Sequence, residues 1–370
     1  MSGASDTRVD PFRPGTDDAE ALGLRAEVWG ADHPHSHPAF FRWLFGAGNP
    51  AGPGSGVMLR RAGRLVGFAG LCPRLAQLGG TAVRVAHGLD YMVSPGVSAA
   101  ASGRFALRVA ADWATFARQG GYDFGINFPN ANSRRLLTSD RLGWQPVLAP
   151  ALMVRPLAAP ATSIVAGGAV RRLALRFGLG VGAGALAVRA AATRGRAAGA
   201  VRAVDLGSAA DAGLIDALWH RVAAVRDAGL LRDAAALRWR YGQHPLYRYR
   251  MLGWQDGDRM DALVITAQRH LFGMDCLLVV DALIDPGRPA AAARLVGDAI
   301  RASGAALAVA QAVPGHDLAG ALRRAGFLAV PERFNPKPFQ MVALPLAVQA
   351  RSGALPASTW QFGWGDMDVV

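Results

Sequence analysis

Three ionisable side chains that could move protons lie close together in one segment: His87, Asp90 and Tyr91. Imidazole, carboxylate and phenol groups are among those that proteins use to accept or donate protons. The segment 82–93 has the composition of a β-strand, and successive side chains of a strand point to opposite faces. Simple alternation therefore predicts that His87 and Tyr91 face one side and Asp90 the other, so only one of these sets faces a given cleft.

The histidines and cysteines of the chain do not form a pattern that predicts a metal site. Prolines interrupt the histidine-rich run 33–38, and no carboxylate spacing completes a ligand set. Cys72 and Cys276 stand in apolar, strand-like runs that fit neither a disulfide framework nor a zinc site. We therefore expect two buried thiols and a reducing, cytoplasmic setting.

The two halves of the chain share residue patterns, which predicts two similar domains. Three pairs of segments occur in the same order: 40–45 with 236–241, 90–96 with 281–287, and 141–144 with 324–327. In the first half, hydrophobic periodicity and turn residues predict the order βααβββαβαβ, with a long helix after Pro95-Gly96. The second half repeats this order, with helices near 209–227, 233–241, 289–303 and 317–325 and strands near 200–205, 248–254, 260–268, 275–284, 305–311 and 338–344.

The charge and hydropathy of the chain restrict its partners. The net charge is +13, yet the arginines are scattered through both halves instead of clustering with aromatics, which argues against DNA and leaves an anionic ligand such as a nucleotide, a phosphorylated cofactor or tRNA. The N-terminus lacks the apolar core of a signal peptide. The longest apolar run, 177–188, is shorter than the ~20 residues of a membrane span, so we expect it to pack between domains or to lie on an anionic surface.

The element order carries a family resemblance. Together with Met92-Val93-Ser94-Pro95 before a helix and Leu142-Gly143-Trp144 after one, it resembles the GNAT superfamily of acyl-CoA-dependent N-acyltransferases, over 8–155 and more weakly over 202–345. The resemblance implies an α+β (α/β) fold of two tandem GNAT-like domains, each a mixed, mostly antiparallel sheet flanked by helices. The expected parts are an acyl-CoA-binding domain at 1–155, an Ala/Gly/Arg-rich connection at 156–200, a second, degenerate domain at 201–346, and a Trp-rich tail at 347–370.

The same resemblance places the donor, acetyl-CoA or another acyl-CoA. In the superfamily, the turn after the Val-x-Pro strand presents backbone N–H groups at a helix N-terminus to the pyrophosphate of CoA. Here Ser98 stands in place of the usual Arg or Gln, Ala99 and Ala101 replace glycines, and Gly103 matches. Alanine keeps its backbone N–H group, so no hydrogen-bond donor is lost from the turn. The resemblance therefore implies that these residues and Ser102 bind the acyl-CoA.

Four further donor contacts follow from the resemblance. Met92 and Val93 end the strand, and Asn127 and Asn132 stand where acyl-pantetheine would pass between splayed strands. An amide there can bond the donor or the substrate, or it can cap a helix, which is the alternative for Asn132. In the second half, Asp285 adds negative charge at the matching turn and Pro289 removes an N–H, so CoA is expected in the first domain.

The resemblance also suggests catalytic roles. Members of the superfamily deprotonate the acceptor amine with a carboxylate or a histidine, and some reprotonate the leaving thiolate with a tyrosine. Asp90 is then a general base or an anchor for the amine, with His87 and Tyr91 as the other candidates. Alternatively Asp90 bridges neighbouring loops, because Asp281 repeats it in the less suitable half. Ser139 occupies the usual place of the tyrosine.

These observations imply an N-acyltransferase that moves an acyl group from acyl-CoA to the amine of a small polar acceptor, such as an amino sugar or an amino acid derivative. The tail at 360–368 is similar to that of bacterial members associated with polysaccharide or surface-glycan biosynthesis. Two alternatives stay open: a transferase resembling the peptidoglycan-bridge type that uses aminoacyl-tRNA, and a non-catalytic binding protein. Asp366 and Asp368 either reach into a cleft between the domains or belong to a solvated terminus.

Overall fold

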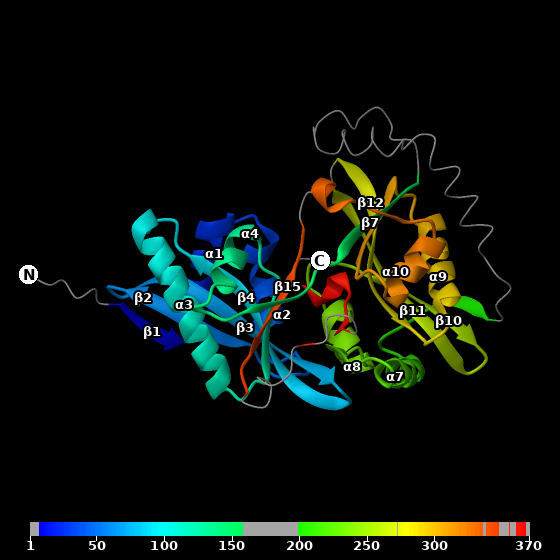
Figure 1. Cartoon of the computed structure of the whole chain (residues 1–370), viewed down its shortest axis with the longest axis horizontal. Helices are drawn as coiled ribbons and strands as arrows, with labels where there is room; N and C mark the ends of the chain where they lie inside the picture. Colours follow the sequence, from blue (N-terminus) through cyan, green and yellow to red (C-terminus); the bar gives the residue numbers. More distant parts are fainter. Residues whose placement is uncertain are drawn as a thin grey trace, which may run out of the picture. The chain divides into compact units, whose positions relative to one another are not determined.

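The computed structural model describes residues 7–157, 199–271, 273–335, 338–347, 355 and 360–367. The chain forms two compact units (Figure 1). Unit 1 comprises Met1–Leu148, Gln243–Leu246 and Gln340–Ala357, and unit 2 comprises Ala149–Gly242, Tyr247–Phe339 and Ser358–Val370. The apolar run 177–188 and Asp368 lie outside the described residues.

Unit 1 is built on one mixed sheet in the order β1-β2-β3-β4-β5-β15-β6. Its strands are β1 (Thr7–Pro11), β2 (Ser55–Arg61), β3 (Arg64–Leu78), β4 (Thr81–Val93), β5 (Phe124–Asn127), β15 (Met341–Pro345) and β6 (Gln145–Leu148). Neighbouring strands are antiparallel except β4 and β5, which are parallel. Gly79 and Gly80 join β3 to β4 with positive φ at both positions, as a tight two-residue hairpin requires.

Helices cover both faces of this sheet. They are α1 (Asp18–Trp29), the 3₁₀ turn η1 (Pro34–Ser36), α2 (Pro38–Phe45), α3 (Ala99–Gln119) and α4 (Ala131–Leu137). The apolar stripe of α3 packs with Val57, Leu59 and Leu71 of the strands. On the opposite face, Phe12, Phe41, Phe45 and Phe68 form a cluster of edge-to-face and tilted ring contacts with centroids 4.7–6.0 Å apart.

Unit 2 repeats this plan. Its sheet has the order β14-β7-β13-β12-β11-β10-β8. From β8 onward, neighbouring strands are antiparallel except for β12 and β13, which matches the pattern of unit 1 from β1 onward. The strands are β8 (Ala200–Ala203), β10 (Arg250–Asp256), β11 (Arg259–Leu271), β12 (Met274–Ile284), β13 (Leu307–Ala312), β7 (Ala151–Pro156) and β14 (Leu328–Ala329). The expectation of two mixed, mostly antiparallel sheets flanked by helices is confirmed.

The remaining described elements of unit 2 are helices and short strands. They are α7 (Ala209–Ala223), β9 (Ala228–Leu230), α8 (Ala234–Leu237), the π-helical turn η2 (Arg238–Gly242), α9 (Pro289–Arg301), α10 (Asp317–Arg324), and the short pieces η3 (Glu332–Phe334), β16 (Trp360–Gln361) and η5 (Trp364–Asp366). The helix expected at 209–227 therefore ends at Ala223, and β9 follows it. Of the described helices, none is long and apolar enough to cross a membrane.

Each half of the sequence ends in a long strand that lies in the sheet formed mainly by the other half. β7 pairs with β13 and β14 of unit 2, whereas β15 pairs with β5 and β6 of unit 1. Figure 1 shows β15, in orange, among the blue and cyan strands of unit 1. The expected domains at 1–155 and 201–346 thus differ from the observed units at these strands, because a hydrophobic pattern identifies a strand but not its partner.

Candidate active site

The central feature of unit 1 is a parting between two parallel strands. β4 and β5 pair at Val85 with Phe124, Ala86 with Gly125, and His87 with Ile126. β5 ends one residue later, whereas β4 continues to Val93. The amide of Asn127 donates a hydrogen bond of 2.8 Å to the carbonyl of Gly88 and so bridges the strands where they separate. Beyond this point, residues of β4 form one wall of a pocket.

A β-bulge at Asp90 sets the directions of the side chains along that wall. β3 pairs with β4 at Gly70 with Leu89 and at Phe68 with Met92, so the single residue Ala69 faces two residues of β4. Asp90 has a φ of 51°, a left-handed conformation that non-glycine residues seldom adopt. An irregular backbone of this kind interrupts the alternation on which the sequence-based prediction rested.

The bulge corrects that prediction for His87. A Cβ added at Gly88 would meet Trp113 of α3, so His87, the preceding residue, faces away from α3. Tyr91 faces α3, where its hydroxyl donates to the carbonyl of Ala106. Asp90 faces α1. His87 and Asp90 therefore share one face of the sheet and Tyr91 lies on the other.

Asp90 forms a buried ion pair with Arg25 of α1. The Arg25 Nε donates to Asp90 Oδ2 at 2.9 Å, and both side chains are fully buried. The same guanidinium donates to the carbonyl of His35 at 2.5 Å and lies 4.6 Å from the ring centroid of Phe41. This is the bridging role that the sequence left open for Asp90, and it ties the bulge to α1 and to the following loop.

The two other candidate proton-transfer groups lie in different surroundings. His87 is buried and makes an edge-to-face contact with Phe128 at a centroid distance of 5.7 Å. Burial raises the pKa of Tyr91 above its ordinary value, so its hydroxyl stays protonated across the physiological range. Tyr91 can therefore donate a hydrogen bond at this site, but its raised pKa makes it a weaker acid than an ordinary tyrosine.

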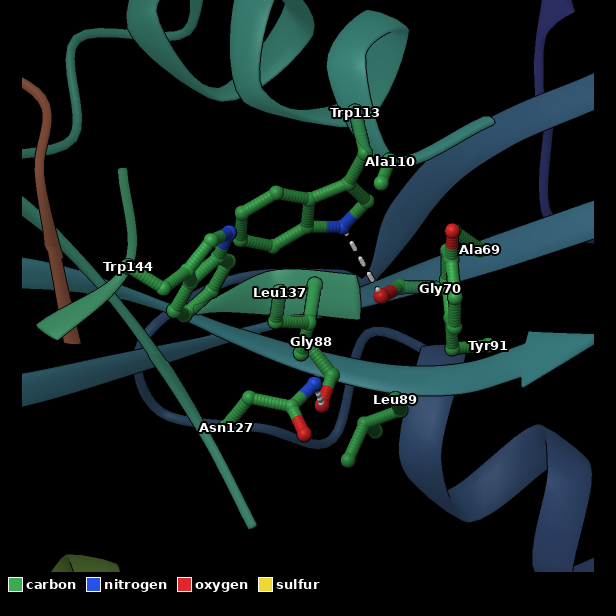
Figure 2. A pocket seen from close by; sticks show the side chains of 10 residues that line it. All are labelled: Ala69, Gly70, Gly88, Leu89, Tyr91, Ala110, Trp113, Asn127, Leu137 and Trp144. Atoms are coloured by element: carbon green, nitrogen blue, oxygen red, sulfur yellow. Dashed lines mark hydrogen bonds between the residues drawn. The ribbon is translucent and has the colours of Figure 1, made fainter. Parts of the chain in front are cut away.

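An apolar pocket opens at the parting on the α3 face (Figure 2). It holds about 260 Å³, including the part open to solvent. Its ten lining residues are Ala69, Gly70, Gly88, Leu89, Tyr91, Ala110, Trp113, Asn127, Leu137 and Trp144. Trp113 and Trp144 pack at a centroid distance of 5.6 Å, and the Trp113 Nε1 donates to the carbonyl of Gly70 at 3.0 Å.

The residues expected to bind the donor phosphates begin α3. Ser98 precedes the helix without making a side-chain cap, and the first turn contains no acidic residue. Ala99, Ala101, Ser102 and Gly103 follow within the helix. The first N–H groups of an α-helix have no partner inside the helix, and the N-terminus carries partial positive charge. This end of α3 is thus suited to an anion.

The other expected donor residues are separated by the structure. Met92 is buried and Val93 half-buried at the end of β4, and Asn127 lies at the parting. Asn132 instead is exposed in the first turn of α4, and the cap of that helix is Asn130, whose side chain accepts from the backbone N–H groups of Asn132 and Ser133. The alternative that Asn132 caps the helix was therefore wrong by two positions.

Sequence reasoning did not identify Gly88, Trp144 or Arg25 as parts of the site. Gly88 carried a usable signal, because a lone glycine within a strand often marks a close approach of another group. Arg25 carried none, since a basic residue in a surface helix is ordinarily solvated.

In unit 2 the equivalent bulge is covered by the C-terminal segment. Asp281 accepts hydrogen bonds from Arg232 Nε at 3.0 Å and from the Tyr241 hydroxyl at 2.9 Å, and Arg232 Nη2 also donates to Asp366 at 2.8 Å. Gly363 packs so closely against Asp281 that a side chain there would clash. Burial raises the pKa of Asp281, and the neighbouring Asp366 carboxylate acts in the same direction. Asp366 is therefore a buried residue of unit 2, not part of a solvated terminus.

The turn before α9 in unit 2 also differs from that of unit 1. Asp285 is bound by Arg221 at 3.1 Å and by Arg259, so its charge is neutralised inside the protein. Pro289 is the first residue of α9 and supplies no N–H.

Comparisons with known proteins bear on the fold. The sequence matches no protein-family model and no curated protein. Among solved structures, a GCN5-related N-acetyltransferase from Anabaena variabilis superposes with a TM-score of 0.63 at 12% identity, covering 93% of this chain and 74% of that one. One from Kribbella flavida gives a TM-score of 0.56 at 14% identity, covering 92% and 71%. Saccharomyces cerevisiae N-myristoyltransferase with bound myristoyl-CoA gives 0.56 at 10% identity, covering 93% and 84%.

The chain has the fold of the GNAT acyltransferases. At these identities the likeness concerns the fold alone.

Proposed function

We propose that the protein is an N-acyltransferase that moves an acyl group from acyl-CoA to the amine of a small polar acceptor, with the donor bound in unit 1. The observation that carries this proposal is the parting of β4 and β5 directly before the N-terminus of α3. A strand whose edge is released from its neighbour offers backbone donors and acceptors to an extended ligand, and the helix end offers a site for its phosphates.

The donor lies along this path in the proposal. Its phosphates meet the backbone of Ser98, Ala99, Ala101, Ser102 and Gly103. The pantetheine arm then runs back along β4, past Val93 and Met92, towards the amide of Asn127. The rise of ~3.3 Å per residue makes Gly88 to Val93 about 17 Å long, a span suited to an extended arm. The thioester carbonyl thereby comes to the closed end of the parting, beside Gly88 and Asn127.

The reaction forms one bond and breaks another. The acceptor nitrogen attacks the thioester carbon, the C–S bond breaks, the nitrogen loses a proton and the thiolate gains one. His87 takes the proton of the amine, because it lies on the α1 side of the sheet and the neighbouring carboxylate of Asp90 is held by Arg25. The thiolate takes its proton from water, because the raised pKa of Tyr91 makes the hydroxyl on the α3 side a weak acid. Asp90 positions the bulge through its ion pair with Arg25.

A thiol-release assay tests this function. Acetyl-CoA is mixed with the protein and a panel of amino sugars and amino acid derivatives, and free CoA is measured. We expect His87→Gln to lower kcat by about 10² or more, the scale of a lost general base, and to remove the acidic limb of the pH profile. The control His220→Gln, on the exposed surface of α7, should leave the rate unchanged. Unaltered kcat in His87→Gln would remove the role assigned to His87.

The acceptor and the setting are further parts of the proposal. An amino sugar fits the resemblance to bacterial members associated with surface-glycan biosynthesis, and cytoplasmic location is supported by two buried cysteines that are both free thiols. The net charge of +13 favours aminoacyl-tRNA as the alternative donor. Retention of tRNA that falls steeply with salt, without any binding of CoA, would support that alternative.

A further inference from the structure

The C-terminal segment 360–367, drawn in red in Figure 1, lies on unit 2 in the manner of a bound peptide. Its first two residues form the short strand β16, which pairs in parallel with β9 through Trp360 with Ala228 and Gln361 with Gly229. The side chain of Trp360 is fully buried. Strand addition combined with a buried aromatic anchor is a recurring mode by which proteins bind separate peptides.

Two buried arginines of unit 2 hold the polar end of this segment. The Arg240 Nε donates to the carbonyl of Gly365 at 2.6 Å, and its Nη2 donates to the carbonyl of Met367. The Arg232 Nη2 donates to both oxygens of the Asp366 carboxylate at 2.8 Å. Charge-assisted hydrogen bonds are about twice as strong as neutral ones, so this contact selects an acidic residue at position 366.

Two glycines of the segment touch side chains of unit 2 where no further atom fits. A Cβ at Gly363 would collide with the Asp281 carboxylate, and one at Gly365 would collide with the Tyr241 hydroxyl. The Tyr241 hydroxyl donates to Asp281 at 2.9 Å and both residues are buried, so neither can move aside without breaking that bond. The contact therefore excludes side chains at both glycine positions.

The charge of the site also depends on the segment. Unit 2 contributes the guanidinium groups of Arg232 and Arg240 and the carboxylate of Asp281, and all three side chains are buried. These groups leave an excess of positive charge, which the carboxylate of Asp366 compensates. A buried charge that loses its partner is strongly destabilising, so the site requires an acidic group whenever it is closed.

We propose that this face of unit 2 is a peptide-binding site that recognises the sequence Gly-x-Gly-Asp, and that segment 360–367 occupies it as a detachable ligand within the same chain. The site is separate from acyl transfer in unit 1. A ligand tethered to its own site has an effective concentration on the order of millimolar and competes with free peptide. Free peptide therefore binds well only to a chain whose own segment is disabled.

Fluorescence anisotropy of a labelled peptide of residues 358–368 tests this proposal on the full chain. Gly363→Ala in the chain disables its own segment and leaves the receptor residues unchanged, so we expect this chain to bind the peptide at least about tenfold more tightly than the wild-type chain does. Asp366→Asn is the second chain variant, in case Gly363→Ala does not fold. The control Gly213→Ala, on α7 with open space around it, should bind the peptide as weakly as the wild-type chain.

Changes in the peptide and in the receptor test the recognition itself, with the Gly363→Ala chain as the starting point. A peptide carrying Asp366→Asn should bind at least about tenfold more weakly, because it loses a charge-assisted contact. A peptide carrying Gly365→Ala should show no measurable binding. Arg240→Lys in the chain should weaken binding of the unaltered peptide at least about tenfold, since lysine cannot reproduce the fork of a guanidinium. The matched control Arg238→Lys, whose side chain bonds elsewhere, should not.

Three results would overturn the proposal. Equal affinity of the wild-type and Gly363→Ala chains for the peptide would show that the segment does not compete for the site. Absence of binding to either disabled chain would show that unit 2 has no separable peptide site. A Gly365→Ala peptide that binds as tightly as the unaltered one would show that the glycine contacts do not select the ligand.

Discussion

At the residue scale, the sequence predicts the strand that carries Asp90 but not the face of the sheet that Asp90 shares with His87. Its place on a strand beside His87 and Tyr91 was predicted correctly. The bulge that turns it towards α1 depends on the pairing of β3 with β4, which no local pattern encodes. Its partner Arg25 lies 65 positions away in the chain, so the ion pair is visible only in three dimensions.

We predict that Asp90→Asn destabilises the protein. The substitution leaves the Arg25 guanidinium buried without a counter-charge, and removal of one partner from a buried ion pair costs about 3 kcal/mol or more. Denaturant unfolding monitored by tryptophan fluorescence measures the loss. Asp112→Asn, which removes an exposed ion pair with Arg108, should change stability by less than about 0.5 kcal/mol. Replacing both Arg25 and Asp90, by Met and Asn, should recover part of the loss, and no loss in Asp90→Asn would show that the pair is not structural.

At the element scale, α3 is the clearest success of the sequence. Its buried stripe follows from Val109 and Trp113 at helical spacing after a Pro-Gly break, and the turns at Gly79-Gly80 and Ala62-Gly63 follow from their residues. The cap of α4 was missed because several asparagines compete for one position and only geometry chooses Asn130. The start of α3 carries the site's main functional prediction.

We predict that Ser98→Asp separates folding from donor binding. Aspartate is a favoured N-cap and should stabilise α3 by up to about 1 kcal/mol, yet its charge and its hydrogen bonds compete with the phosphates of CoA. Calorimetry should show at least about a tenfold weaker affinity for CoA together with an unchanged or raised Tm. Ser208→Asp, at the cap of α7, is the matched control and should alter affinity little. Full CoA affinity in Ser98→Asp would place the phosphates elsewhere.

At the scale of the whole molecule, the exchange of β7 and β15 makes the two halves of the sequence depend on each other. Repeats within the sequence predicted two sheets, and the structure contains them. The exchange itself was not predictable. The apolar patterns of β7 and β15 would be the same whether each strand joined the sheet of its own half or that of the other half.

We predict that a fragment ending at residue 157 does not fold cooperatively. It lacks β15, which lies between β5 and β6 in the sheet of unit 1, and so leaves both strand edges open. Co-expression of the fragments 1–157 and 199–370 should restore a stable complex that co-purifies and unfolds in a cooperative transition. A fragment 1–157 that unfolds cooperatively on its own would contradict the exchange.

The central claim, that acyl-CoA lies along β4 and the start of α3 in unit 1, is tested most directly by hydrogen–deuterium exchange of the full chain with and without acetyl-CoA. A ligand slows exchange of the amides that it binds or stabilises. The account predicts slower exchange in peptides that cover 87–93, 98–103 and 124–130, with little change in the matching peptides at 278–292. Protection confined to 278–292, or no protection anywhere at saturating acetyl-CoA, would contradict it.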